Sequence, residues 1–320
     1  MKNTSKIKSL VLTTLIKKWN LYFQMKDVTE IIVNQANEII LEKNGKFEYI
    51  YDENINEQFL LDFCEQLANY RNMFFNVNVP HLSSSIPNTN IRVQALHPSI
   101  TRNNNISLVM RIPNNQIFQI TDFKLGNKLI EKNINYENIK NIIINKKNLL
   151  VSGGTGSGKT SFINSLIQLV PKEERIITIE DSSELKIENK NQTNILISKN
   201  DQNTYSYQDG MNDAMRMRPD RVFVGEIDTR NTMLFLRLSN TGHTGMISTI
   251  HANGVEEAIE AITLNAKFDG NDTSVNDLKE YFINAIDFVI QIKKIKNERI
   301  ISDFLDVKKT FKENKNDKRN

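Results

Sequence analysis

The chain has 320 residues, of which 39% are hydrophobic and 25% are charged. This composition is typical of a globular protein and excludes a disordered chain, a collagen and a coiled-coil rod, while the length favours two domains. No apolar run approaches the roughly 18 residues that a membrane-spanning helix needs. The single cysteine, Cys64, excludes an internal disulfide framework and a cysteine-rich zinc site, as is typical of a reducing compartment.

The net charge of +3 is unevenly distributed. Residues 1–20 contain five lysines and no acidic residue, and residues 306–320 contain six basic and three acidic residues. The rest of the chain is therefore net acidic, and its composition does not indicate direct nucleic-acid binding. The basic ends are either solvated or in contact with anionic lipid or a protein partner.

The N-terminus is predicted to form an amphipathic helix and not a signal peptide, because its apolar stretch is short and no small-residue cleavage site follows it. Apolar residues recur near helical spacing at Ile7, Leu10, Val11, Leu15 and Trp19. We expect these five residues to form one face of the helix.

The remainder of the first part of the chain is predicted to be mixed α and β. A helical pattern covers 58–70, and Asn44-Gly45 is typical of a hairpin turn. The β-prone runs are 28–33, 38–41, 47–51, 91–96 and 106–112. We predict a smaller mixed α/β domain at 1–115, a linker at 116–127 and a second domain at 128–320.

In the second domain, short apolar runs alternate with helical patterns. The expected strands are 148–151, 175–179, 194–197, 222–224, 246–250 and 288–292, and the expected helices are 159–169, 207–217 and one that begins at 255. This alternation predicts an α/β fold with an open, mainly parallel sheet covered by helices.

The most specific motif follows the first of these strands and fits the pattern G-x-x-x-x-G-K-[ST]. Glycines allow a tight turn that presents backbone N–H groups to phosphate oxygens, and the dipole of the following helix favours an anion. The lysine of such a loop reaches the β- and γ-phosphates, and the hydroxyl after it binds Mg²⁺. The residues are Gly153, Gly154, Thr155, Gly156, Ser157, Gly158, Lys159 and Thr160.

Acidic residues stand where two later strands end. Glu180 and Asp181 follow the strand 175–179, and Glu226 follows 222–224, with Gly225 where many nucleotide-binding strands carry aspartate. An acid at this edge of a parallel sheet orders Mg²⁺-bound water or polarises the water that attacks a phosphate. On spacing alone, each acid is equally explained as a solvated turn residue.

Two of the four histidines, His243 and His251, flank the strand 246–250. A zinc site is disfavoured because no third or fourth ligand is evident nearby. A histidine where a strand ends could position a γ-phosphate or simply pack in a loop.

Together, these motifs resemble those of the secretion-superfamily P-loop ATPases, above all the conjugation and type IV secretion traffic ATPases. The matching segments are the Walker A motif at 153–160, the Asp box at 175–185, the atypical Walker B motif at 218–226 and the His box at 241–253. A weaker likeness extends through 27–34, 91–93 and 110–111.

The resemblance implies a RecA-like P-loop domain with ATP and Mg²⁺ as cofactors, and nucleotide held between the two domains. It also implies a homo-hexamer at the cytoplasmic face of the inner membrane, with other secretion-machine ATPases and inner-membrane components as partners. The implied activity is ATP hydrolysis that powers substrate transfer or pilus assembly.

The resemblance also assigns site residues. Nucleotide-binding residues are those of the loop together with Ser161, Arg216 and Arg218. Catalytic residues are Glu226, Glu180, His251, Arg92 and Arg111, while Mg²⁺ is held by Thr160 and, through water, by Glu180. One departure concerns the arginine that usually follows the Walker B glutamate by two residues, because Asp228 stands there and Arg230 comes two residues later.

Three other functions remain open. A pilus assembly or retraction motor of the same superfamily fits the motifs, although one cysteine cannot build the four-cysteine zinc element of the type II secretion branch. A nucleotide-binding ring scaffold with little hydrolysis would not need Glu226. A small-molecule kinase would need an acceptor pocket and a lid that the sequence does not reveal.

Overall fold

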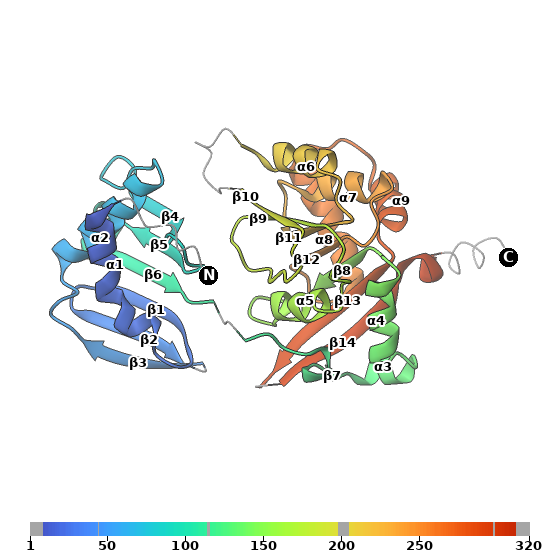
Figure 1. The fold of residues 1–320 in the computed structure, drawn as a ribbon, viewed down its shortest axis with the longest axis horizontal. Helices are drawn as coiled ribbons and strands as arrows, with labels where there is room; N and C mark the ends of the chain where they lie inside the picture. Colours follow the sequence, from blue (N-terminus) through green and yellow to red (C-terminus); the bar gives the residue numbers. More distant parts are fainter. Residues whose placement is uncertain (1–8, 44, 114–115, 198–204, 297, 312–320) are drawn as a thin grey trace. The chain divides into compact units, whose positions relative to one another are not determined.

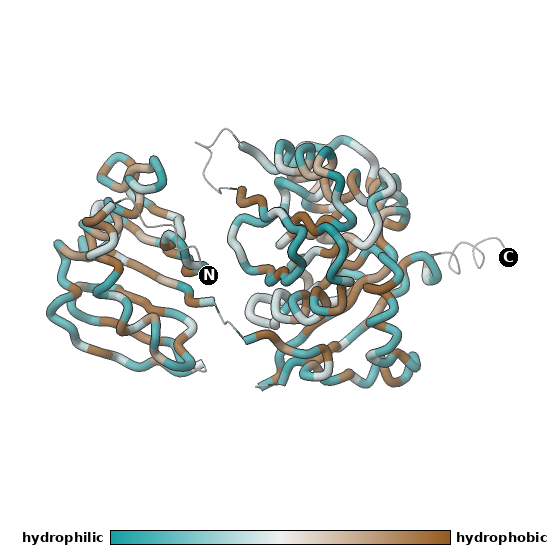
Figure 2. The backbone as a smooth tube through the Cα atoms, viewed as in Figure 1, coloured by the Kyte–Doolittle hydropathy of each residue, from teal (hydrophilic) through white to brown (hydrophobic). Residues whose placement is uncertain are grey.

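The structure, a computed structural model, describes residues 9–43, 45–113, 116–197, 205–296 and 298–311. The chain divides into two compact units, 1–115 and 116–320 (Figure 1). Hydrophobic residues, brown in Figure 2, recur along the strands of both units. The mixed α/β class predicted from the sequence is confirmed. The basic residues within 1–8 and 312–320, and Asn44 of the predicted turn, lie outside the described residues.

The described part of the first unit is a six-stranded sheet with two α-helices. The strand order is β3-β2-β1-β6-β5-β4, and all neighbours are antiparallel. The elements are α1 (Leu10–Phe23), β1 (Val28–Gln35), β2 (Glu38–Lys43), β3 (Lys46–Tyr51), α2 (Glu57–Tyr70), β4 (His81–Ser85), β5 (Arg92–Leu96), the 3₁₀ turn η1 (Pro98–Ile100) and β6 (Ser107–Arg111).

The N-terminal helix is present, but its buried face differs from the one expected. Leu12, Trp19 and Tyr22 are buried against the core of the first unit, whereas Leu10 is 82% exposed and Val11 is also exposed. Because each residue turns a helix by about 100°, positions 12, 19 and 22 share a side that position 10 cannot reach. The prediction that Leu10 and Val11 belong to the apolar face is therefore wrong.

The second unit carries the predicted phosphate-loop motifs. Its elements are the 3₁₀ turn η2 (Ile120–Asp122), β7 (Lys124–Leu125), α3 (Asn127–Glu131), α4 (Tyr136–Ile144), β8 (Leu149–Ser152), α5 (Lys159–Ile167), β9 (Ile176–Glu180), β10 (Gln192–Leu196), α6 (Tyr207–Arg216), β11 (Arg221–Ile227), α7 (Thr232–Asn240), β12 (Ile247–Ile250), α8 (Val255–Phe268), α9 (Val275–Ala285), β13 (Phe288–Ile295) and β14 (Glu298–Asp306).

In the described residues these strands form one sheet in the order β10-β9-β11-β12-β8-β13-β14-β7. The strands from β10 to β13 are mutually parallel, β14 is antiparallel to β13, and β7 is parallel to β14. The carboxyl ends of β8, β9, β11 and β12 therefore meet at one edge of the sheet.

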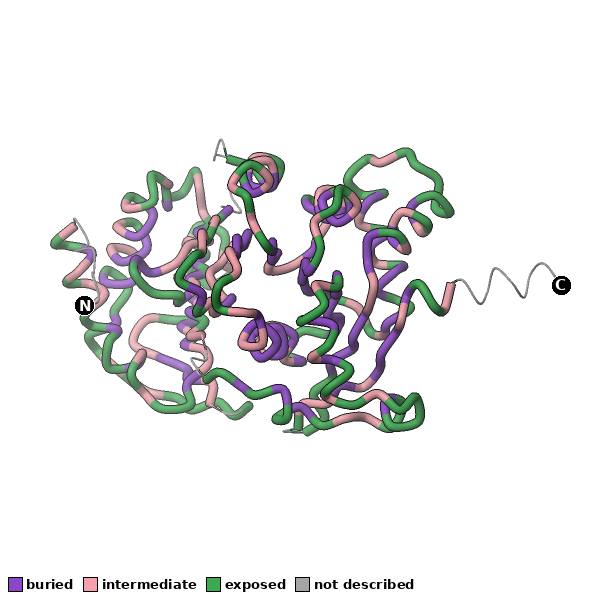
Figure 3. The backbone as a smooth tube through the Cα atoms, turned by 45° about the vertical axis from the view of Figure 1, so that its right-hand side comes forward, coloured by how far each residue is buried: buried purple, intermediate pink, exposed green. Residues whose placement is uncertain are grey.

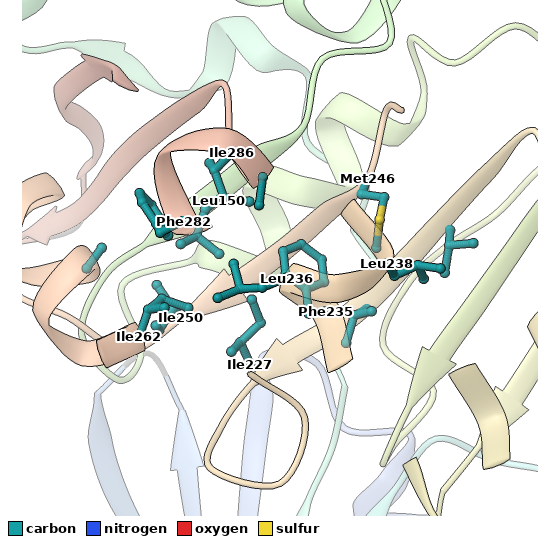
Figure 4. Close-up of a cluster of buried hydrophobic side chains, with 14 of the residues drawn as sticks. Leu150, Ile227, Phe235, Leu236, Leu238, Met246, Ile250, Ile262, Phe282 and Ile286 are labelled. Carbon is teal, nitrogen blue, oxygen red and sulfur yellow. The ribbon is translucent and has the colours of Figure 1, made fainter. Parts of the chain in front are cut away.

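Helices cover both faces of this sheet. Consecutive side chains of a strand point to opposite faces, so the contacts of neighbouring residues show which helices lie on each face. Leu150 of β8 packs in a cluster with α6, α7, α8 and α9, whereas its neighbours Leu149 and Val151 pack in another with α4 and α5. Figure 4 shows side chains of α7, α8 and α9 gathered around Leu150, Ile227 and Ile250. Every residue of β8, β9 and β12 is buried, and β11 is buried from Arg221 to Val224 (buried residues are purple in Figure 3).

The segment 116–127, which the sequence suggests is a linker, takes part in the second unit. Its residues Phe118, Ile120 and Phe123 are buried in the cluster that includes α5, and β7 pairs with β14. The break at Pro113-Asn114-Asn115 indicates a boundary, but the apolar residues after it pack on elements far away in sequence, which local pattern does not reveal.

A buried ion pair fixes the amino end of β11. The Arg221 side chain is fully buried, and its Nε lies 2.5 Å from Glu174 Oε2. Its Nη1 donates to the carbonyl of Ile143 at the end of α4 at 2.7 Å. A buried guanidinium needs both a counter-charge and hydrogen-bond acceptors, and this one has both.

We expect Glu174→Gln to lower the free energy of unfolding by about 3 kcal/mol, because it leaves the Arg221 charge buried without its counter-ion. Equilibrium urea unfolding followed by circular dichroism measures this change. The matched control is Glu173→Gln, since Glu173 is the exposed neighbour. Equal unfolding midpoints for the two variants would contradict a stabilising role for the pair.

Candidate phosphate-binding site

The glycine loop joins β8 to α5 at the carboxyl edge of the sheet (Figure 1). Gly158 directly precedes α5 and has a φ angle of +96°, a conformation that other residues adopt only with strain. This turn brings the chain directly into the helix, so that the free N–H groups of the first turn of α5 face the loop.

Lys159 is buried although it is charged, with 7% of its surface exposed. Its Nζ donates to the carbonyl oxygens of Gly153 at 2.9 Å and Gly154 at 3.2 Å, and lies 3.2 Å from His251 Nδ1. The loop thus holds the ammonium beside its own backbone, where an anion bound by the loop would meet it.

His251 lies between Lys159 and Glu226. Its Nε2 is 2.6 Å from Glu226 Oε1. Burial and the Lys159 ammonium lower the pKa of His251, and Glu226 only partly opposes them. Because an ammonium can only donate, Nδ1 must be the acceptor, so the proton of the neutral ring is on Nε2 and faces the carboxylate. The structure therefore brings together three of the predicted site residues.

Glu180 ends β9 and is 3% exposed. Its Oε1 accepts hydrogen bonds from the backbone N–H groups of Glu184 and Leu185, both at 2.8 Å. Burial raises the pKa of Glu180 to about 7, although these two hydrogen bonds act in the opposite direction. The carboxyl group therefore holds the segment of the Asp box that follows β9.

Gly225 is explained by the same side chain. A Cβ atom on Gly225 would lie 3.2 Å from Glu180 Cγ, which is closer than nearly all such contacts. The aspartate that many nucleotide-binding strands carry at this position would require the Glu180 side chain to shift by a few tenths of an ångström. The space that the missing side chain leaves is thus filled by the neighbouring strand's acid.

Asn231 supports Glu226 and was not identified from the sequence. This fully buried side chain donates to the carbonyl of Glu226 at 2.9 Å and accepts from the N–H of Asp228 at 3.0 Å. Both bonds fix the backbone immediately after β11. A single asparagine before a helix is common, so no local signal distinguishes it.

The departure at Asp228 also has a structural account. The backbone N–H of Arg230 donates to Asp228 Oδ1 at 2.8 Å, and its Nε donates to Oδ2 at 2.9 Å. The Arg230 guanidinium also lies 4.0 Å from Asp181 Oδ2 and 5.2 Å from the ring centroid of Tyr207. Arg230, two residues after the position where the family carries arginine, therefore places its guanidinium between the Walker B and Asp box segments.

Gln291 of β13 is a second residue that the motifs did not indicate. It is fully buried opposite Ser152, and its Nε2 donates to the carbonyl of Ala252 at 3.2 Å. This bond anchors the His box segment just after His251. Only the strand order places Gln291 here.

Two of the four predicted arginines belong to the first unit and two to the second. Arg92 and Arg111 lie opposite each other on β5 and β6 of the first unit. Arg216 ends α6, and Arg218 lies shortly before β11, at the amino edge of the second sheet. Because β11 is parallel to β8, that edge is opposite to the one that carries the phosphate loop.

The loop fits a phosphate group. A Cβ atom at Gly154 or Gly156 would meet nothing within 4 Å, so the outer side of the loop is open. Ser157 Oγ is buried and has no hydrogen-bond partner in the described residues. Residues 154–157, Asn253 and 291–296 line a cavity of about 490 Å³. Thr160 and Ser161, in the first turn of α5, are half-buried beside Lys159, where a hydroxyl can ligate Mg²⁺.

Neither a cluster of metal-binding side chains nor a membrane-spanning helix is present in the described residues. No group of three or more His, Cys, Asp or Glu side chains there is arranged to hold a metal ion. No helix in that part of the chain is both long enough and apolar enough to cross a membrane.

A glycine loop before a helix, with lysine, histidine and two acids at the carboxyl edge of parallel strands, defines a phosphate-loop protein of the α/β class. Residues 21–266 match the family model described as "Type II/IV secretion system protein", and the chain belongs to this family. The resemblance predicted from the four motifs is confirmed.

Individual relatives are consistent with this family. The type IV secretion system protein VirB11 of Bartonella henselae is 28% identical over 90% of both chains. The probable conjugal transfer protein TrbB of Sinorhizobium fredii is 26% identical over 72% of this chain and 68% of TrbB. The pilus retraction motor PilT with bound ADP has a TM-score of 0.64 at 19% identity, covering 96% of this chain and 87% of PilT, which is a likeness of fold.

The buried carboxyl of Glu180 should make stability depend on pH. Folding raises its pKa from 4.5 to about 7, so between these values the native state holds a proton that the unfolded chain releases. Stability should therefore fall as pH rises through this window, by up to roughly 1.4 kcal/mol per pH unit from this group. In Glu180→Gln the dependence should be flatter, as urea unfolding at pH 5, 6 and 7 would show.

The matched control is Glu188→Gln, because Glu188 is an exposed acid of the same segment. It should keep the wild-type dependence on pH. If Glu180→Gln keeps that dependence as well, Glu180 does not titrate in this window.

Proposed function

We propose that the chain is an ATP-hydrolysing motor subunit of a type IV secretion or conjugation machine, built on a RecA-like P-loop domain. The observation that carries this proposal is the contact series Lys159–His251–Glu226 beside the glycine loop. The names of VirB11 and TrbB, at 28% and 26% identity, support the transport function.

Nucleotide binding would use the loop and the first turn of α5. Backbone N–H groups of 153–160 and the Lys159 ammonium would bind the phosphates, with Ser161 next to them. Thr160 would ligate Mg²⁺, and Glu180 would hold a water of the metal shell while it orders the Asp box. When bound, Mg²⁺ neutralises charge on the phosphate oxygens.

Hydrolysis would depend on Glu226. Its carboxylate can orient a water molecule and accept its proton, and Asn231 holds the backbone that carries it. The neutral ring of His251 keeps a proton on Nε2 toward this carboxylate, while its Nδ1 accepts from Lys159. His251 thus connects Lys159 to Glu226, and a movement of the lysine would reach the glutamate through the imidazole ring.

Arginines would stabilise charge on the transferred phosphoryl group. Arg92 and Arg111 are cross-strand neighbours, so the first unit presents two guanidinium groups at one register position. Because Arg216 and Arg218 lie at the amino edge of the second sheet, we propose that they act in a homo-hexamer, where neighbouring subunits meet.

The partners of this hexamer would be other secretion-machine ATPases and inner-membrane components, with the ring at the cytoplasmic face of the inner membrane.

We expect Lys159→Ala to abolish nucleotide binding, because it removes the ammonium that the loop holds beside its own backbone, where the phosphates would bind. Glu226→Gln should lower ATP turnover about a hundredfold or more while nucleotide still binds, since glutamine cannot accept a proton. Steady-state phosphate release and ADP titration measure these effects. Glu260→Gln, an exposed acid on α8, is the control. Wild-type turnover in Glu226→Gln would refute its role.

The ring is tested separately by the mass of the purified chain with and without a non-hydrolysable ATP analogue. A mass six times that of the 36.9 kDa chain supports the hexamer. A monomer under both conditions would contradict it.

A pilus motor is the second candidate, because the fold is shared with PilT. Disruption and complementation of the gene separate the two functions. Loss of substrate transfer with normal pilus retraction supports the secretion motor, and the reverse result supports the pilus motor. Ring assembly without measurable hydrolysis would indicate a scaffold, and phosphate transfer to an added acceptor would indicate a kinase.

A further inference from the structure

The hairpin of β13 and β14 brings a group of basic residues to the phosphate loop, outside all four motifs. Lys293, Lys294 and Lys296 line the same cavity as residues 154–157 of the loop. Across the hairpin, Arg299 pairs with Lys294. The acids that serve the motifs lie on other strands, so this side of the loop is mainly positive.

The side chain of Arg299 packs directly on the loop. A Cβ atom on Gly158 would lie 3.1 Å from both Cδ and Nε of Arg299. The guanidinium carbon is 4.2 Å from the ring centroid of Phe118. Phe118 contacts Phe123, and Phe123 contacts Phe162 of α5, with centroids 6.2 Å and 4.9 Å apart. A row of aromatic rings therefore holds the guanidinium beside the start of α5.

This guanidinium has less compensation than a half-buried cation normally requires. Its Nε is buried and has no hydrogen-bond partner in the described residues. Burial lowers the pKa of Arg299, and the carboxylate of Asp122 opposes this only in part. A group held in this way gains most from an anion that reaches the loop.

The strand order shows which part of a nucleotide would reach it. Glu226 on β11 and His251 after β12 lie on one side of β8, and Arg299 on β14 lies on the other. If the terminal phosphate points toward Glu226, the opposite end of the molecule extends toward β13 and β14.

We propose that Arg299 binds the nucleotide at its α-phosphate and nucleoside end, and so sets affinity for ADP and ATP alike. This inference rests on the proposed function. Arg299 acts in binding and not in the chemical step, since the groups that orient water lie on the other side of the loop.

The test is titration calorimetry of purified full-length protein with Mg-ADP and with a non-hydrolysable Mg-ATP analogue. In Arg299→Met, whose side chain keeps an apolar stem against Gly158 and Phe118, we expect Kd to rise about tenfold for both nucleotides. In ATP turnover, KM should rise by a similar factor while kcat stays within about twofold. Arg299→Lys keeps the positive charge but not the planar guanidinium, so its Kd should remain about threefold above that of the wild type.

Arg237→Met is the matched control, because Arg237 is an exposed arginine on α7. Circular dichroism of each variant without nucleotide checks the fold. If Arg299→Met does not fold, the Kd of Arg299→Lys is the deciding measurement. A Kd threefold or more above that of the wild type supports a guanidinium contact, and a wild-type Kd overturns it.

Two further results would overturn the inference. One is an unchanged Kd in folded Arg299→Met, and the other is weakened binding of the triphosphate analogue alone, which would place Arg299 at the terminal phosphate. A wild-type protein that binds ADP but does not hydrolyse ATP would refute the proposed function and leave the comparison of Kd values valid.

Discussion

The parallel alignment of β8, β12 and β11 is the constraint on which the site depends. Parallel strands end at the same edge of a sheet, so Lys159, His251 and Glu226 meet there although long stretches of sequence separate them. The Lys159 ammonium donates to His251 Nδ1, and His251 Nε2 lies 2.6 Å from the Glu226 carboxylate. A shift of one residue in either pairing would turn alternate side chains to the other face and separate the three groups.

Buried polar groups keep the ends of these strands in place. Glu226 is itself half-exposed on a flexible stem, so its position depends on the backbone that carries it. Asn231 binds the carbonyl of Glu226, and Thr249 of the adjacent strand donates to the carbonyl of Gly225 at 2.9 Å. Glu180 fills the space beside Gly225 and holds the following segment. Strand ends have few neighbours to pair with, and side chains supply the missing hydrogen bonds.

The phosphate loop, the alternation of strands and helices and the acids at strand ends could be predicted because each depends on residues close together in sequence. The strand order could not be predicted from the sequence, since it is set by packing between distant elements. The roles of Gln291, Arg299 and the aromatic residues of 116–127 depend on that order, so they could not be predicted either. The N-terminal helix shows a different limit. Its composition predicts a helix, but which face is buried depends on where Trp19 packs in the hydrophobic core of the first unit.

The recognisable motifs lie on one side of the phosphate loop because the two sides place different demands on the sequence. Binding a phosphate and activating a water molecule demand particular residue types at fixed spacing, and β8, β9, β11 and β12 supply them in short segments. Contact with the rest of a nucleotide demands only a cation or an apolar surface within reach, which many residues on many strands can provide. The β13–β14 hairpin meets this weaker demand through its register with β8, so its function is visible in the sheet and not in the sequence.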